Sequence, residues 1–169
     1  MSTLDPVTGG AHCSIGGTQH DYVVTSTLSS QAPPAVGRAL GAQLASQLKI
    51  ENAPISPRAV SYVSLGDGSV NNAHFLAALN LAEYASHRGF KCPTLFGITD
   101  NQISISLRGY DWLPKFVKQR IGMKVFHADG TDVVDSFRAA TEATQFVRKK
   151  RKPAVVVFSN LPRRYGHAA

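Results

Sequence analysis

The sequence predicts a three-layer α/β/α domain built on a mostly parallel sheet. Short runs rich in β-branched and apolar residues recur at positions 59–65, 93–98 and 154–158. Runs of this kind are typical of parallel strands whose two faces are both covered. Between them lie longer stretches in which apolar residues recur at helical spacing, so we expect helices to cross from one strand to the next.

Size and charge limit the classes of protein to consider. A chain of 169 residues with 43% hydrophobic content can bury one sizeable core, so we expect a single domain over residues 1–169. Most of the net charge of +7 lies in residues 148–152 and in Arg163 and Arg164. Basic and aromatic residues do not interleave there, and a solvated helix end explains the first run better than nucleic-acid binding.

Cysteine usage and hydropathy predict a soluble intracellular protein. Cys13 and Cys92 are far apart and show no Cys-x-x-Cys pairing, which indicates reduced thiols. No apolar stretch approaches the length of a membrane span, and the N-terminus lacks a basic region followed by an apolar run. We therefore expect no membrane association and a cytoplasmic location.

The N-terminal part of the chain is predicted to be a loop followed by a helix. Residues 8–31 are rich in Gly, Ser, Thr and His, with one short strand expected at 22–25. Pro33 and Pro34 open a helix over about 35–48, since proline is favoured in the first turn. The expected apolar face of this helix consists of Val36, Leu40, Leu44 and Leu48. A linker at 51–58 then leads to the first buried strand.

The second half continues the alternation of helices and strands. A short helix is expected over 111–120, a strand over 123–127, and a long helix beginning at Asp132, whose side chain is a favoured cap. One side of the long helix is predicted to carry Val134, Phe137, Ala140, Thr144 and Val147. The last strand, 154–158, is a continuous apolar run.

Two polar loops follow neighbouring strands and form the candidate site. Gly66-Asp67-Gly68-Ser69 follows the first strand and precedes a helix whose predicted apolar face is Phe75, Ala78, Leu79, Ala82 and Ala85. Residues 99–104 follow the next strand. Open α/β sheets bind ligands at the carboxyl ends of their strands.

The residues of these loops suit a magnesium diphosphate. The two glycines let backbone N–H groups and a helix N-terminus approach an anion closely. Magnesium prefers carboxylate, amide and carbonyl oxygens together with phosphate oxygens. Asp67, the amide oxygen of Asn101 and the carbonyl of Ile103 match that preference.

The two loops together resemble the thiamine diphosphate motif of transketolases and 2-oxo acid dehydrogenases. The resemblance lies in Gly66-Asp67-Gly68, in the Ala-Leu-Asn-Leu-Ala segment of the helix, and in residues 100–106. It implies the thiamin diphosphate-binding fold, with residues 66–69 on the cofactor and with Asp67, Asn101 and the carbonyl of Ile103 on magnesium. Two features depart from the pattern: Asp100 stands where the family has asparagine, and the spacing between the loops is longer than usual.

Residues 26–37 resemble a segment of the branched-chain dehydrogenase α subunits, Ser-x-Leu-x-Thr-Gln-x-Pro-x-Ala-Val-Gly. The resemblance implies that Leu28 meets the aminopyrimidine of the cofactor through its carbonyl. It also makes Ser26, Ser30 and Gln31 candidate ligands of a potassium ion. On the residues alone, the alternative is an ordinary helix N-terminus preceded by Ser and Gln.

The C-terminal residues 161–168 resemble the Tyr-Arg-x-x-Gly-His-Ser segment of dehydrogenase α subunits. The resemblance implies that His167 contacts the terminal phosphate of the cofactor and assists reductive acylation of lipoamide. A terminal histidine without function is the alternative that its position alone favours. Ala168 stands where mammalian members carry a regulatory phosphoserine, so no such switch is expected.

The resemblance covers nearly the whole chain and implies an oxidoreductase, the first (E1) component of a branched-chain-type 2-oxo acid dehydrogenase, of the alpha-subunit type. The implied activity is thiamine diphosphate- and magnesium-dependent oxidative decarboxylation of a 2-oxo acid, with acyl transfer to lipoamide. The implied location is cytoplasmic, or the mitochondrial matrix in a eukaryote. A transketolase-like enzyme and a noncatalytic assembly module that retains the fold are the alternatives.

The chain is expected to supply the diphosphate-binding half of an active site. The family places a carboxylic acid against the pyrimidine ring of the cofactor, and Glu51, Glu83 and Glu142 lie in no motif that resembles it. We therefore expect a fragment of a longer enzyme that is inactive alone. The implied partners are a pyrimidine-binding domain or beta subunit and the lipoyl acyltransferase component, within an oligomer.

Overall fold

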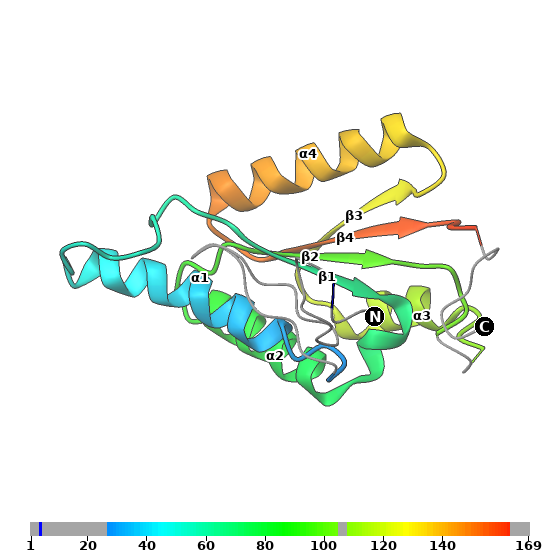
Figure 1. Ribbon diagram of the computed structural model, residues 1–169, viewed down its shortest axis with the longest axis horizontal. Coiled ribbons are helices and arrows are strands. Elements are labelled where there is room, and N and C mark those ends of the chain that lie inside the picture. The colour runs from blue at the N-terminus through cyan, green and yellow to red at the C-terminus, as the bar shows by residue number, and fades with distance from the viewer. Residues whose placement is uncertain (1–3, 5–26, 105–107, 163–169) are drawn as a thin grey trace.

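The structure, a computed structural model, describes residue 4 and residues 27–104 and 108–162. Over these residues helices and strands alternate (Figure 1). The helices are α1 (Ala32–Gln47), α2 (Ala73–His87), α3 (Trp112–Arg120) and α4 (Val133–Lys150), with a short 3-10 helix, η1 (Asp67–Asn71), and the strands are β1 (Ser61–Gly66), β2 (Thr94–Thr99), β3 (Lys124–Asp129) and β4 (Ala154–Ser159). The strand predicted at 22–25 lies outside the described residues.

The four strands form one sheet in the order β1-β2-β4-β3, and each neighbouring pair is parallel. α4 covers one face of the sheet, while α1 and α2 cover the other (Figure 1). This arrangement confirms the predicted three-layer α/β/α architecture. Because the strands are parallel, the segments that follow β1, β2 and β4 all emerge at the same edge, which we call the carboxyl edge.

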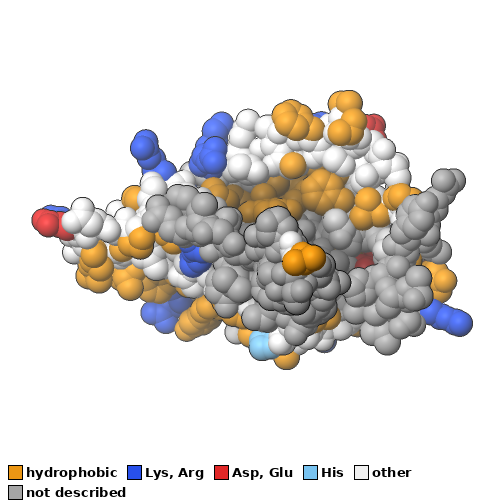
Figure 2. Space-filling view, viewed as in Figure 1, with side chains coloured by type: hydrophobic (Ala, Val, Ile, Leu, Met, Phe, Trp, Pro, Cys, Tyr) orange, Lys and Arg blue, Asp and Glu red, His pale blue; other side chains and the backbone are white. Residues whose placement is uncertain are grey.

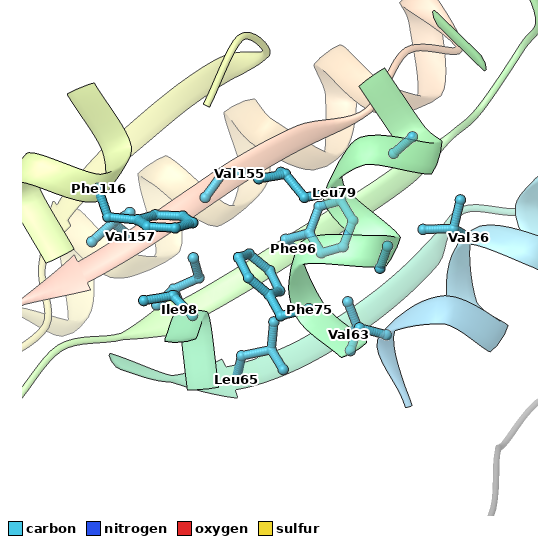
Figure 3. Packing of buried hydrophobic residues seen from close by; sticks show 14 of the residues in the cluster. Val36, Val63, Leu65, Phe75, Leu79, Phe96, Ile98, Phe116, Val155 and Val157 are labelled. Carbon is cyan, nitrogen blue, oxygen red and sulfur yellow. The ribbon is translucent and has the colours of Figure 1, made fainter. Parts of the chain in front are cut away.

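The larger part of the core lies between the sheet and α1, α2 and α3. Side chains from β1, β2 and β4 point toward these helices and gather around Phe75 of α2 (Figure 3). The ring of Phe75 packs edge-on against that of Phe96 with centroids 5.8 Å apart, and lies 6.0 Å from that of Phe116. Burying one such side chain contributes roughly 1.5–3 kcal/mol. This packing fixes η1, which connects β1 to α2.

The helix after the first loop buries the face that the sequence predicts. The buried residues of α2 are Phe75, Ala78, Leu79, Ala82 and Ala85. Asn72 caps its N-terminus, where the Asn72 side-chain oxygen accepts a hydrogen bond of 2.8 Å from the N–H of His74. The crossover from β1 to β2 therefore agrees with the prediction from sequence.

The predicted face of the first helix is partly wrong. α1 begins at Ala32 and buries Val36 together with small residues such as Ala39, whereas Leu44 and Leu48 are 54% and 64% exposed. Residues four apart drift by about 40° around a helix of 3.6 residues per turn. After two or three such steps the leucines have left the face that packs on α2 and β1.

The predicted apolar side of α4 is also partly wrong. The helix buries Ala139, Ala143 and Val147 against the sheet, whereas Val134 and Phe137 are 73% and 74% exposed. Alanines allow the helix to approach the strands closely, so the bulkier residues of the first turns lie on the outer side. No helix in the described part of the chain is both long and apolar enough to cross a membrane.

Candidate functional site

A cavity of about 320 Å³ opens at the carboxyl edge of the sheet. It is lined by Leu28, Gly66, Asp67, Gly68, Ser69, Thr99, Asn101, Ile103 and Leu161. All of the residues that the sequence assigned to the cofactor or to magnesium are among these, except His167. Thr99 and Leu161 were not predicted, although Thr99 is the last residue of β2 and Leu161 follows β4 at this edge.

Ser30 and Gln31 do not line the cavity. The side-chain amide of Gln31 donates a hydrogen bond of 3.2 Å to the carbonyl of Ser64 in β1, so it ties the start of α1 to the sheet. Ser26 and His167 lie outside the described residues. The potassium ligands and the role of His167 therefore stay predictions.

Asp67 is the acidic group of the cavity and is joined to the second loop. It follows the last residue of β1 directly, and only 7% of its surface is exposed. Its Oδ2 atom accepts two hydrogen bonds from Ser104, one from the backbone N–H at 3.0 Å and one from the hydroxyl at 3.1 Å. Its other oxygen, Oδ1, makes no hydrogen bond within the described part of the chain. We call the paired contact with Ser104 the Asp67–Ser104 clip.

Two glycines make room for this clip. A Cβ atom on Gly68 would lie 3.2 Å from the backbone of Ser104. A Cβ atom on Gly109 would lie 2.0 Å from the Ser104 hydroxyl oxygen. Ser104 itself is 1% exposed and has a left-handed backbone with φ 47°. No expectation from sequence assigned Ser104 or Gly109 a role at the site.

The second loop is folded by its own side chains. Oδ1 of Asp100 accepts a hydrogen bond of 2.9 Å from the N–H of Gln102, and Oδ1 of Asn101 accepts one of 3.0 Å from the N–H of Ile103. Such bonds to the backbone two residues on are a common use of Asp and Asn in turns. Either residue type can make this bond, which gives a physical reason why Asp100 is tolerated where the family has asparagine.

Asp100 also connects the site to the neighbouring strand. Its N–H donates to the carbonyl of Phe158 at the end of β4, and its carbonyl accepts from the N–H of Leu161, at 2.9 and 3.3 Å. The carboxylate-bearing residue is 4% exposed. The segments that follow β1, β2 and β4 are therefore held together by hydrogen bonds at this edge.

The segment ahead of α1 reaches the same loops. Ser29, which is 1% exposed and has φ 62°, donates its hydroxyl hydrogen bond to the carbonyl of Ser69 at 3.1 Å. This contact brings Leu28, which is 40% exposed, to the rim of the cavity. Sequence reasoning had not singled out Ser29, because its partner is 40 residues away.

The donor set of the cavity fits a magnesium diphosphate. One carboxylate, one side-chain amide and a backbone carbonyl are hard oxygen donors, and magnesium typically takes one or two carboxylates plus phosphate oxygens. No group of three or more His, Cys, Asp or Glu residues that could hold a metal occurs among the described residues, so a metal held wholly by such side chains is not indicated there. Gly66 lines the cavity, and a Cβ atom there would meet no atom within 4 Å, which leaves space beside the backbone for an anion.

A parallel sheet with a cavity at its carboxyl edge is the ligand-binding arrangement of open α/β domains, and the thiamine diphosphate-binding fold is one of these. A transketolase from Leishmania mexicana has a similar fold, with a TM-score of 0.56 and 25% sequence identity over 79% of this chain and 20% of the transketolase chain. In sequence, the chain is 28% identical over 128 residues to the chloroplastic pyruvate dehydrogenase E1 component subunit alpha-3 of Oryza sativa subsp. japonica. That match covers 73% of this chain and 29% of the rice protein.

The family follows from a match over almost the whole chain. The model of the dehydrogenase E1 component family matches residues 2–169, and the chain belongs to that family. The rice relative is, by its name, an alpha subunit of such a component. The chain spans less than a third of the length of the rice relative that it matches.

Proposed function

We propose that the chain binds thiamine diphosphate and magnesium in the carboxyl-edge cavity, as the diphosphate-binding half of a 2-oxo acid dehydrogenase active site. The observation that carries this proposal is the state of Asp67. The Asp67–Ser104 clip uses one carboxylate oxygen, and the other is left beside the cavity without a hydrogen bond in the described chain. Asp67 is 7% exposed and belongs to neither ion pair of the described residues, and a carboxylate in such a place is stabilised by a cation.

Different residues of the cavity would bind different parts of the cofactor and its metal ion. Asp67, the amide oxygen of Asn101 and the carbonyl of Ile103 would hold magnesium, and residues 66–69 would approach the diphosphate through their backbone. Leu28 lies at the rim, where the rest of the cofactor would extend. His167 would reach the terminal phosphate, and Ser26, Ser30 and Gln31 would hold potassium if the ion is present. Bound thiamine diphosphate supplies a carbon nucleophile and an electron sink for decarboxylation.

The pyrimidine ring of the cofactor needs a carboxylic acid against it. No acidic residue other than Asp67 lines the cavity among the described residues, and Asp67 is assigned here to magnesium. We propose that a pyrimidine-binding domain or beta subunit supplies this carboxylic acid, and that the acyl group passes to a lipoyl acyltransferase component. A branched-chain 2-oxo acid is the proposed substrate class, on the strength of residues 26–37.

The test is calorimetric titration of the full-length protein and its partner subunit with thiamine diphosphate, with and without magnesium. Asp67→Asn keeps an oxygen that can accept both bonds from Ser104 but loses the charge, so we expect magnesium-dependent affinity to fall at least about tenfold, or 1.4 kcal/mol. Glu142→Gln removes one negative charge from an ion pair on α4 and is the control. Unchanged affinity in Asp67→Asn with an intact fold would contradict the assignment of the metal ligand.

A transketolase-like ketol transfer is the second candidate, supported by the structural similarity to the Leishmania enzyme. The reconstituted holoenzyme separates the two. Decarboxylation of branched 2-oxo acids with an electron acceptor supports the dehydrogenase, and transfer of ketol units between sugar phosphates supports the transketolase. If the assembled protein bound no cofactor, the result would support the third alternative, a noncatalytic assembly module that retains the fold.

A further inference from the structure

A second polar cavity, of about 600 Å³, lies at the opposite edge of the sheet. Its lining residues precede the strands: Pro57 and Arg58 come before β1, Lys91 before β2, and Arg151 before β4. Gln43, Ser46 and Arg148 complete the wall from the C-terminal parts of α1 and α4. We call this the amino-edge cavity. The proposed cofactor function makes no use of it.

The walls of this cavity are held in place by hydrogen bonds. The guanidinium of Arg151 donates to three successive carbonyls, those of residues 57, 58 and 59. The amide of Gln43, which is 8% exposed, donates to the carbonyl of Pro57 at 2.7 Å. The loop ahead of β1 is therefore fixed to both α1 and the end of α4, and the cavity is a defined feature of the fold.

The charges that line the cavity are all positive. Arg58, Lys91, Arg148 and Arg151 line it, and no carboxylate does among the residues that the structure describes. Within the described residues both ion pairs of the protein belong to Arg138, so none of these four cations is paired there with an acidic side chain. Burial, and then the charge of Arg148, hold the pKa of Arg151 below its usual value. Four positive charges therefore lie close together with no acidic partner in the described part of the chain.

The helix dipole explains only part of this arrangement. Cations in the last turn of α4 are favoured by the partial negative charge at the helix C-terminus, which accounts for Arg148 and its neighbours. Arg58 and Lys91 belong to other segments and gain nothing from that dipole. In Figure 2, Lys and Arg side chains gather over this end of the molecule, around the C-terminal end of α4. An anion that bridges the segments would remove the repulsion between them.

We propose that the amino-edge cavity binds a small polyphosphate compound, a molecule that carries two or more linked phosphate groups. Three of the five guanidinium N–H donors of an arginine suffice for its three carbonyl bonds, and the remaining donors of Arg151 are available to a phosphate. The cavity volume lies within the range of about 300–1,000 Å³ usual for small-molecule sites. This site is separate from the cofactor cavity because the two lie at opposite edges of the sheet.

The test is calorimetric titration of the full-length protein and its partner with tripolyphosphate, in EDTA to keep magnesium out of the cofactor cavity. We expect saturable binding that weakens at least about tenfold in Lys91→Gln/Arg148→Gln, because two charges that contact the anion are lost. The matched control is Lys149→Gln/Lys150→Gln, which removes the same total charge, from the end of α4 beside Arg148, without touching the lining residues. We expect the control to weaken binding much less than the first double variant, because exposed charges outside the cavity act on the anion only through screened, longer-range attraction.

Several results would overturn the proposal. Equal loss in the two double variants would mean diffuse attraction, and full affinity in Lys91→Gln/Arg148→Gln would place the anion elsewhere. Tighter binding of a hexaglutamate peptide than of tripolyphosphate would assign the surface to an acidic protein partner. No saturable binding of tripolyphosphate by the wild-type protein would remove the site altogether. Each of these outcomes is independent of the titration with thiamine diphosphate.

Discussion

Replacing Ser104 by alanine tests the Asp67–Ser104 clip directly. The substitution removes the hydroxyl that donates to Asp67 at 3.1 Å and keeps the backbone N–H that donates at 3.0 Å. A hydrogen bond to a charged group contributes about 1.5–3 kcal/mol. Because Ser104 is 1% exposed, water cannot replace the lost donor, and we expect the free energy of unfolding to fall by about this amount.

Urea denaturation followed by circular dichroism measures this loss. With a slope of about 1–3 kcal/mol per molar urea, the midpoint is expected to fall by roughly 1 M. Ser46→Ala, at an exposed position of α1, is the matched control and should move the midpoint little. Magnesium-dependent binding of thiamine diphosphate should also weaken in Ser104→Ala, because the Asp67 carboxylate loses part of its fixed orientation. A midpoint for Ser104→Ala equal to that of Ser46→Ala would refute the clip.

Three further predictions concern the loops and α4. Gly68→Ala should lower the urea midpoint because its Cβ would lie 3.2 Å from the backbone of Ser104, whereas Gly41→Ala, with nothing within 4 Å in a helix, should raise stability by about 0.5–1 kcal/mol. Asp132→Ala should cost about 1 kcal/mol by thermal denaturation, since Asp132 caps α4 through the N–H groups of residues 134 and 135, and Asp132→Asn should retain most of that stability. The N–H of Asp129 donates to the carboxylate of Asp135, and this bond, then the bond from Arg138, holds the pKa of Asp135 below its usual value. That stabilisation is present above the unfolded pKa of about 3.9 and is lost as the pH falls through the folded value, so the midpoints of wild type and Asp135→Asn should differ at pH 7 and converge on acidification.

Much of the fold follows from local pattern. Each predicted strand within the described residues exists within two or three residues of its expected bounds, and all five buried residues of α2 were predicted, because apolar runs and helical spacing are properties of a single segment. The outer residues of α1 and α4 were assigned to the wrong face. The side of an amphipathic helix that packs inward depends on how closely its alanines approach the neighbouring layer. Helical spacing within one segment does not specify the shape of that layer.

The residues that line the site could be predicted from the sequence, but the hydrogen bonds that hold its loops together could not. Asp67 and Asn101 were found because carboxylate and amide groups follow adjacent strands, and the cavity brings them together. Ser104 and Ser29 escaped notice because their partners are 37 and 40 residues away and are set by the register of the sheet. The residues next to a serine in a polar loop do not indicate whether its hydroxyl bonds to a distant segment or to solvent.

The order of the strands has a consequence for how the protein opens. The cavity is built at the ends of β1, β2 and β4, while β3 pairs only with β4 in the described chain and contributes no residue to the lining. Fraying of β3 from β4 breaks none of the hydrogen bonds between Asp67, Ser104, Asp100, Phe158 and Leu161, so we expect a bound ligand to oppose it little. Hydrogen exchange should then be slowed by ligand in the amides of β1 and β2 much more than in those of β3. With the cofactor bound, β1 and β2 would therefore have a higher free energy of local opening than β3.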